Sequence, residues 1–162
     1  MNRVSKTDYY LDIARSVTTR STCLRRRFGA IIVKDDVIIS TGYNGAPRGR
    51  KNCSDLHFCL REKLEIPRGE RYELCRSVHA EANAIISAGR ERMLGSDLYL
   101  SCTDPKTGEE QFGVCCCSMC KRLVLNAGIA RVIVRSGSGE TIIYDTQDWI
   151  ENDDSLTGDS RY

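Results

Sequence analysis

Residues 28–42 read FGAIIVKDDVIISTG, and the fold can be inferred outward from these residues. The uninterrupted apolar run over residues 28–33 is typical of a strand that is buried on both faces. The charged residues 34–36 predict a turn, and the apolar residues of 37–42 return as a second strand. The stretch is therefore predicted to be a β-hairpin inside a sheet that is covered on both sides.

Helical periodicity appears on either side of the hairpin. In residues 5–20, Tyr10, Ala14 and Val17 follow helical spacing. Residues 77–89 predict a second helix. Its small apolar side chains suit close packing on a sheet and lie on one face: Ala80, Ala84, Ile85 and Ala88. The hairpin is thus expected to have a helix before it in the chain and another after it.

The chain then alternates between strand and helix patterns. Residues 98–101 predict a strand, 104–113 a polar loop, and 129–134 a closing strand. Between the last two lies a predicted helix over residues 117–126, with Met119, Leu123 and Leu125 as its apolar residues and Gly128 as its C-cap. This alternation predicts a three-layer α/β domain with a mixed sheet.

Composition limits the classes of protein that the chain can represent. Its 162 residues suit one domain, predicted over residues 1–150, with an acidic tail over 151–162 that we expect to be frayed. The apolar runs are too short to cross a bilayer and the start lacks a secretory h-region, so we expect a cytoplasmic protein that does not bind membranes. The net charge of +2 does not favour a nucleic-acid partner.

Nine cysteines are many for such a chain, and without a secretory signal they favour metal binding or catalysis over a disulfide framework. The only C-x-x-C spacing is Cys117-Ser-Met-Cys120, which one turn of helix would bring around a single ion. By itself this motif fits a redox pair, half of a structural zinc site or half of a catalytic one.

The pair His79-Ala-Glu81 favours the catalytic reading. One imidazole and the thiolates of Cys117 and Cys120 leave an open fourth position on zinc, where bound water becomes acidic. A nearby carboxylate that is not a ligand can then carry protons. The order H-x-E followed by C-x-x-C is the signature of zinc deaminases. We therefore assign His79, Cys117 and Cys120 to the metal and Glu81 to proton transfer.

The chain resembles the deoxycytidylate (dCMP) deaminases of the cytidine deaminase superfamily. The similar stretches are TGYNGAPRG at 41–49, HAEANA at 79–84 and NAG at 126–128. The resemblance implies a three-layer α-β-α cytidine deaminase-like fold with a mixed five-stranded sheet. It implies zinc-dependent hydrolysis of dCMP to dUMP and ammonia, with attack at C4 of the base. It also implies that Asn44 contacts the sugar and the backbone of Ala80 the base.

The same resemblance implies a homohexamer and regulation by dCTP and dTTP. The regulator would bind at the loop formed by Gly42, Tyr43, Asn44 and Gly45. The chain departs from the family at Cys116, where proline is usual, and in the longer segment 104–114. We expect the first change to loosen the ligand helix slightly and the second to reshape the rim of the pocket.

A second, structural zinc is expected from the remaining cysteines. Residues 50–76 contain too few apolar side chains to order themselves, and a closed metal site would supply that stability. Cys23 and Cys53 match ligand positions of family members that carry such a zinc, and Cys59 and Cys75 would complete it, with His57 as a substitute. The alternative is that these residues are buried free thiols. Cys102 and Cys115 are read as packing residues.

The dense basic cluster Arg25-Arg26-Arg27 is either a solvated helix end or an anion site. A monophosphate substrate favours the anion site, because one arginine can bind two phosphate oxygens through two parallel hydrogen bonds. We expect Arg26 or Arg27 to bind the 5′-phosphate, with Arg48 in reserve. Successive side chains of a strand point to opposite faces, so the strand determines which of these arginines points inward. The sequence does not show which one it is.

Three other functions remain open at this point. The enzyme could deaminate cytidine, deoxycytidine, a tRNA adenosine or a riboflavin precursor instead. The chain could be a non-catalytic module that zinc stabilises, although a structural site needs no carboxylate such as Glu81 beside its metal. It could be a thiol redox protein that uses Cys117 and Cys120, and the presence of His79 argues against this.

Overall fold

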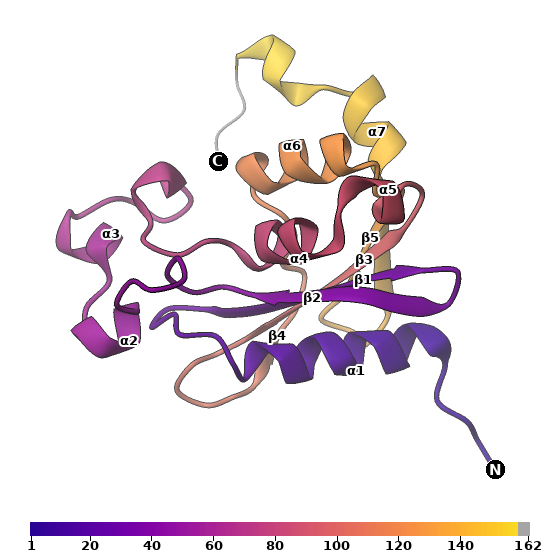
Figure 1. Ribbon diagram of the computed structural model, residues 1–162, viewed down its shortest axis with the longest axis horizontal. Helices are drawn as coiled ribbons and strands as arrows, with labels where there is room; N and C mark the ends of the chain where they lie inside the picture. The colour runs from indigo at the N-terminus through magenta and orange to yellow at the C-terminus, as the bar shows by residue number, and fades with distance from the viewer. Residues whose placement is uncertain (159–162) are drawn as a thin grey trace.

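The computed structural model describes residues 1–158 and shows one mixed sheet with helices on both faces (Figure 1). The strands are β1 (Arg27–Lys34), β2 (Val37–Tyr43), β3 (Asp97–Thr103), β4 (Glu110–Gln111), β5 (Arg131–Arg135) and β6 (Thr141–Asp145). The α-helices are α1 (Lys6–Thr18), α2 (Cys53–Leu56), α3 (Leu60–Lys63), α4 (Ala80–Ala88), α5 (Arg90–Met93), α6 (Ser118–Ala127) and α7 (Thr146–Glu151). Two 3₁₀ turns, η1 (Tyr72–Leu74) and η2 (Asp154–Thr157), complete the chain.

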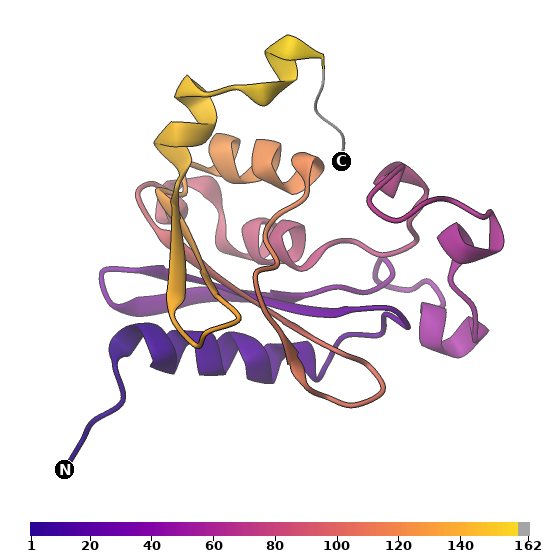
Figure 2. The same ribbon diagram turned by 180° about the vertical axis from the view of Figure 1, so that it is seen from behind.

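The strand order is β2-β1-β3-β5-β6, and the short β4 pairs with β3. Only β3 and β5 are parallel, joined by a crossover through α6, and the other pairs are antiparallel. Helix α1 covers one face, while α4, α5 and α6 cover the other (Figures 1 and 2). The predicted α-β-α fold and mixed sheet are confirmed, with β4 as a sixth strand beside the predicted five.

Strand β1 explains why the sheet is covered on both sides. Ala30 and Ile32 point into the core beneath α4 and α6, while Ile31 and Val33 belong to the separate cluster under α1. All four side chains are buried. The continuous apolar run that predicted this strand is therefore the sum of two alternating faces, each with its own helical cover.

Two glycines let the helices approach the hairpin very closely. A Cβ at Gly29 would lie 2.3 Å from the backbone oxygen of Ala14 in α1. A Cβ at Gly42 would lie 2.3 Å from the backbone oxygen of Ala80 and 2.4 Å from the nitrogen of Ala84 in α4. The small face of α4 thus lies directly on the backbone of β2, as its alanines predicted.

Both functional helices begin later than the sequence suggested. Ser77 and Val78 are not helical, because Val78 forms a β-bridge with Gly45, and α4 starts at Ala80 with His79 as its N-cap. Similarly, α6 starts at Ser118 with Cys117 as its N-cap and ends at Ala127, followed by Gly128, the predicted C-cap.

Two other expectations are corrected. The predicted polar loop 104–113 contains β4, which pairs Gln111 with Cys102 and extends β3 into a hairpin. On α6, Leu123 is exposed, and the buried face consists instead of Cys120, Val124 and Ala127. Helical spacing is compatible with burial of either face, and the buried one is the face that includes Cys120, which lies in the core.

The C-terminal part of the described chain is helical rather than extended. Helix α7 follows β6 directly, and the Thr146 hydroxyl donates a hydrogen bond of 2.8 Å to the backbone oxygen of Ile129. The predicted domain boundary at residue 150 falls within α7, and η2 follows it. Residues 159–162 of the expected tail lie outside the described residues. Among residues 1–158, no helix combines the length and apolarity needed to cross a membrane.

We predict that Gly42→Ala destabilises the protein by about 3 kcal/mol or more, the upper end of overpacking costs, because the new methyl group meets backbone atoms that cannot rotate away. Urea unfolding would measure the change. The matched control is Gly137→Ala, because Gly137 is exposed and its Cβ would meet nothing within 4 Å. This control should stay within about 0.5 kcal/mol of the parent. Equal stability of the two variants would contradict the close packing of α4 on β2.

Candidate active site

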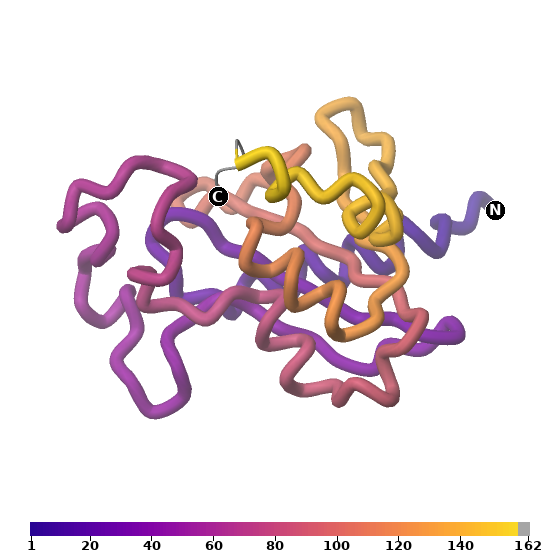
Figure 3. Tube along the Cα trace, turned by 90° about the horizontal axis from the view of Figure 1, so that it is seen from above, coloured from indigo at the N-terminus to yellow at the C-terminus, as the bar shows by residue number. Residues whose placement is uncertain are grey.

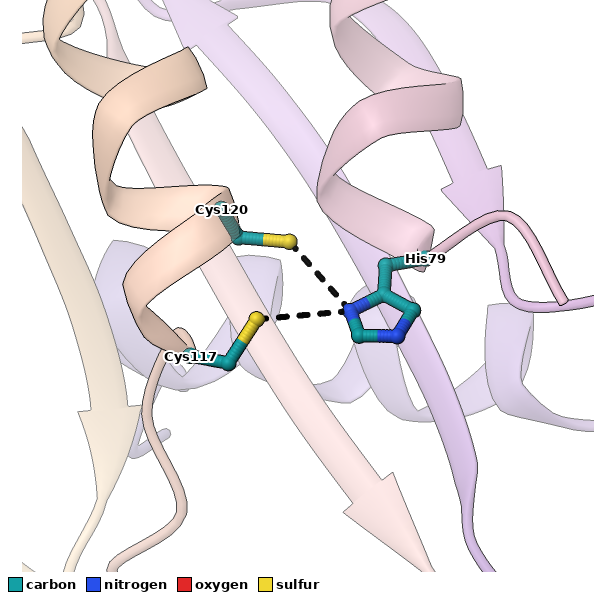
Figure 4. A group of neighbouring side chains, drawn as sticks. All are labelled: His79, Cys117 and Cys120. Carbon is teal, nitrogen blue, oxygen red and sulfur yellow. Dashed lines mark hydrogen bonds between the residues drawn. The ribbon is translucent and has the colours of Figure 1, made fainter. Parts of the chain in front are cut away.

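The N-termini of α4 and α6 lie side by side and carry the three predicted metal ligands. His79 is the N-cap of α4, Cys117 is the N-cap of α6, and Cys120 lies in the first turn of α6 (Figure 4). An N-cap residue has extended backbone while the next residue is helical, so its side chain projects at the helix start. The positive end of each helix dipole also favours thiolate over thiol at this position.

The loop after β2 fixes the start of α4. Gly45 and Val78 exchange backbone hydrogen bonds of 3.2 and 2.8 Å. The side-chain amide of Asn83 donates to the backbone oxygen of Tyr43 at 2.8 Å. Because these contacts hold the residue just before His79, the hairpin positions the imidazole.

The spacing of the donor atoms fits a tetrahedral zinc site. His79 Nδ1 lies 3.5 Å from Cys117 Sγ and 3.4 Å from Cys120 Sγ. Zn–N bonds of about 2.0–2.1 Å and Zn–S bonds of about 2.3 Å at a tetrahedral angle require N···S separations of about 3.6 Å. Within residues 1–158, this is the only group of three or more possible ligands whose donor atoms all lie within 4.8 Å of one another.

The charges of the ligands also fit a cation. Hydrogen bonding from Cys120, and then from His79, lowers the pKa of Cys117 to about 4, although burial acts in the opposite direction. Burial would lower the pKa of His79, but its contacts with Cys117 and Cys75 outweigh burial and raise that pKa to about 10. A thiolate and an imidazole that compete for one proton are the donors that a divalent metal binds after displacing it.

Glu81 lies in the first turn of α4, and its side chain is buried beside this group. Burial raises the pKa of the Glu81 carboxyl above its usual value, and the positive charge of His79 offsets part of that rise. Cys116, which stands where the family usually has proline, hydrogen-bonds to this carboxylate. The structure therefore brings a buried carboxyl group to the metal donors without making it one of them.

A cavity of about 640 Å³ opens onto these residues. His79, Ala80 and Glu81 line it from α4, and Cys117 lines it from α6. Asn44, the predicted sugar contact, lines it from the loop after β2. The cavity thus brings together the predicted metal, proton-transfer and substrate positions, whose individual roles stay predictions.

Asn44 is buried and held rigidly. Its Oδ1 accepts hydrogen bonds from the Phe28 backbone nitrogen at 2.8 Å and from the Ser21 hydroxyl at 2.5 Å. Its Nδ2 donates to the backbone oxygen of Arg26 at 2.9 Å. These bonds tie the loop to the start of β1, so Asn44 also shapes the wall that carries the basic cluster.

The cavity wall is more basic than the sequence indicated. Arg26 lines it, as does Arg25, whose Nε pairs with Glu62 at 3.0 Å. Arg27 opens β1, and neither Arg27 nor Arg48 lines the cavity. Sequence reasoning missed three further cationic residues that do line it: Arg61, Arg68 and Lys121. The charged character of residues 50–76 was the available signal, but nothing in it separated cavity residues from surface ones.

The thiols of the four cysteines of the predicted structural zinc site do not all lie within 4.8 Å of one another. Burial raises the pKa of Cys53, and the thiols of Cys23, Cys75 and Cys59 add to the rise. Cys23, Cys59 and Cys75 also line the cavity, and Cys75 hydrogen-bonds to His79. His57, the substitute ligand, is exposed and does not line it.

Comparison with known proteins connects this geometry to a family. The profile of the cytidine and deoxycytidylate deaminase zinc-binding region matches residues 4–136. The chain belongs to this deaminase family. The match covers α1 through β5 and includes every residue of the His79, Glu81, Cys117 and Cys120 group.

Two relatives with similar sequences are deoxycytidylate deaminases. The chain is 36% identical over 138 residues to that of Mycobacterium phage D29, covering 82% of this chain and 96% of the phage protein. It is 34% identical over 131 residues to that of Schizosaccharomyces pombe, covering 81% of this chain but only 37% of the yeast protein. The chain therefore spans nearly all of one relative and about a third of the other.

Solved structures agree on the fold. A dCMP deaminase from the cyanophage S-TIM5 in apo form superposes with a TM-score of 0.54 at 26% identity, covering 81% of this chain and 82% of the phage chain. A cytidine deaminase from Burkholderia pseudomallei gives 0.55 at 14% identity, covering 87% and 93%, which shows the shared fold alone.

Proposed function

We propose that this protein is a zinc-dependent deaminase that hydrolyses dCMP to dUMP and ammonia. The observation that carries the proposal is the convergence of the donor atoms of His79, Cys117 and Cys120 beside the buried carboxyl group of Glu81, with His79, Cys117 and Glu81 lining one cavity. Membership of the deaminase family and the deoxycytidylate deaminases among the relatives support dCMP as the substrate. The cationic residues of the cavity wall favour a substrate that carries a phosphate.

Zinc, held by His79, Cys117 and Cys120, would supply an acidified water and stabilise developing negative charge. Glu81 accepts a proton from that water, and the oxygen of the water adds to C4 of the base. Glu81 delivers this proton to N3. It then takes the remaining proton of the hydroxyl group now on C4 and passes it to the amino group, so that the C4–N4 bond breaks, the C4 carbonyl forms and ammonia leaves. Burial raises the pKa of Glu81, which suits a group that must hold a proton between two transfers.

The chain's own residues also hold the substrate in place. Asn44, fixed by Ser21, Phe28 and Arg26, contacts the sugar from the floor of the cavity. The backbone of Ala80 contacts the base next to His79 and Glu81. Because both groups belong to rigid elements, C4 would be held beside the metal site without movement of the scaffold.

A second zinc bound by Cys23, Cys53, Cys59 and Cys75 is also part of the proposal. Its support is that Cys53 is buried and that Cys23, Cys59 and Cys75 line the same cavity, so binding would draw the four thiols together from their positions in the structure. In residues 50–76 the buried side chains are Cys53 and Arg61. Closure of the thiols around an ion would supply the stability that apolar burial does not.

Hexamer formation, regulation by dCTP and dTTP, and a cytoplasmic location complete the proposal, and all three follow from family resemblance or composition. Tyr43 supports a regulator site at Gly42 to Gly45, because its side chain is partly exposed while its neighbours are buried. Sedimentation analysis with and without dCTP would test assembly and regulation together.

We predict that Glu81→Gln keeps its fold and its zinc but loses activity by about 10²–10⁴-fold, the usual contribution of a general acid–base group. The amide occupies the same volume but cannot carry a proton. Ammonia release from dCMP measures activity, while metal analysis and thermal unfolding check zinc and fold. Activity within about tenfold of the parent would contradict the role of Glu81 in proton transfer.

We predict that the parent prefers dCMP to deoxycytidine by about 10–100-fold in kcat/KM, because one charge-assisted hydrogen bond contributes about 1.5–3 kcal/mol. Arg26→Ala should erase this preference and leave deoxycytidine turnover nearly unchanged. Arg48→Ala is the control, because Arg48 is exposed and does not line the cavity. If Arg27→Ala erases the preference instead, the phosphate is bound from the other side of β1.

We predict about two zinc ions per chain that separate cleanly by mutation. Cys117→Ala should remove one ion together with activity, whereas Cys53→Ala should remove the other and chiefly lower the melting temperature. Cys102→Ala is the control, because Cys102 is a buried thiol that hydrogen-bonds to Gln111 and belongs to neither group. One zinc in the parent and an unchanged content in Cys53→Ala would rule out the second site.

A further inference from the structure

Residues 50–76 form a lobe beside the sheet, with α2, α3 and η1 as its only helical turns (Figures 1 and 3). The lobe reaches the active-site cavity through Arg61, Tyr72 and Cys75, which line it. Arg61 is 5% exposed. A charged side chain at this burial needs partners, and those partners reveal how the lobe meets the metal site.

Backbone oxygens of the lobe hold the guanidinium of Arg61. Its Nε and Nη2 donate to the oxygen of Glu70 at 3.2 and 2.6 Å, and Nη2 also donates to the oxygen of Pro67 at 3.0 Å. A planar guanidinium that donates from two of its three nitrogens to fixed backbone oxygens has little freedom to rotate. Arg61 therefore presents one defined face to its surroundings.

The ring of Tyr72 lies against that face. Arg61 Cζ is 4.5 Å from the Tyr72 ring centroid, which is cation–π geometry. The backbone fixes the tyrosine as well, because Arg71 adopts a left-handed conformation at φ 50° and the Cys75 nitrogen donates to the Tyr72 oxygen at 2.9 Å. Non-glycine residues adopt this conformation only where the surrounding structure holds them there.

The same tyrosine ring contacts the metal-binding histidine. The rings of Tyr72 and His79 lie 5.4 Å apart at 82°, which is an edge-to-face arrangement. His79 Nδ1 points toward Cys117 and Cys120. The imidazole is therefore bounded by the thiols on one side and by the Arg61–Tyr72 pair on another.

We propose that Arg61 and Tyr72 are positioning residues that hold the His79 ring in the orientation needed for metal binding. The lobe thereby becomes part of the active site through this stack of side chains. The proposal rests on the proposed function only in taking His79 as a zinc ligand. Groups that orient a ligating histidine typically contribute about 10–100-fold in metal affinity.

Zinc affinity tests the stack directly, by competition with a chelator on the full-length protein. Tyr72→Leu, which removes the ring, should weaken binding at the His79 site by about 10–100-fold. Tyr72→Phe, which keeps it, should restore affinity to within about threefold of the parent. Arg61→Lys keeps the charge but not the planar face, so it should weaken binding less than Tyr72→Leu does.

Phe58→Leu provides the matched control. Phe58 lies in the same lobe and carries its own cation, Lys63, whose Nζ is 4.6 Å from the ring centroid, but it does not line the cavity. This variant should bind zinc as the parent does. If Phe58→Leu weakens zinc binding as much as Tyr72→Leu does, general loosening of the lobe explains the effect and the proposal is wrong.

Cobalt substitution gives a second readout that is independent of turnover. Tyr72→Leu should change the d–d absorption of the cobalt protein, because the histidine ligand is reoriented, and Tyr72→Phe should not. If the Cys117→Ala variant binds as much zinc as the parent, the metal site is wrong and so is the proposed function. A parent that binds zinc there, with parent-like affinity and spectrum in Tyr72→Leu, would refute only the positioning role.

Discussion

The contact between the backbones of α4 and β2 sets the position of the active site. Gly42 allows it, because a side chain at this position would collide with the backbone at Ala80 and Ala84. The contact fixes how far α4 lies along the sheet, and the bridge between Gly45 and Val78 stops the helix from starting earlier. His79 is then left at the first turn, where its imidazole faces the start of α6.

The three metal ligands converge because α4 packs closely on β2 and because β3 pairs in parallel with β5. The crossover between these strands places α6 on the same face of the sheet as α4, with its Cys120, Val124 and Ala127 face in the shared core. Cys117 and Cys120 therefore meet His79 without any contribution from flexible segments. Glu81 projects from the next residues of the same helix and is buried by the same packing, so the burial that raises its pKa is a consequence of the fold.

The sequence was sufficient to predict those parts whose signal is local. The apolar run of β1 required cover on both faces, and the alanines of α4 required a close neighbour. Which face of α6 is buried depends on tertiary contacts, so the apolar residues Met119, Leu123 and Leu125 do not identify it by themselves. The arginine that faces the cavity also depends on tertiary structure, because Arg25 and Arg26 precede β1 and line the cavity, whereas Arg27 is the first residue of β1 and does not.

The lobe of residues 50–76 was beyond prediction for a different physical reason. Its order comes from hydrogen bonds of Arg61 to backbone oxygens and from ring contacts of Tyr72, and neither leaves a periodic pattern in the sequence. The sheet and the lobe contribute different residues to the site. The metal donors, Glu81 and Asn44 come from the sheet and from the ends of the elements packed on it, whereas the lobe supplies Arg61, Arg68 and Tyr72. A rigid scaffold can keep its chemistry while a polar lobe changes what the cavity admits. Selection of a phosphorylated substrate would then depend on cations of the cavity wall such as Arg26, Arg61 and Arg68, most of which lie outside the elements that hold the metal.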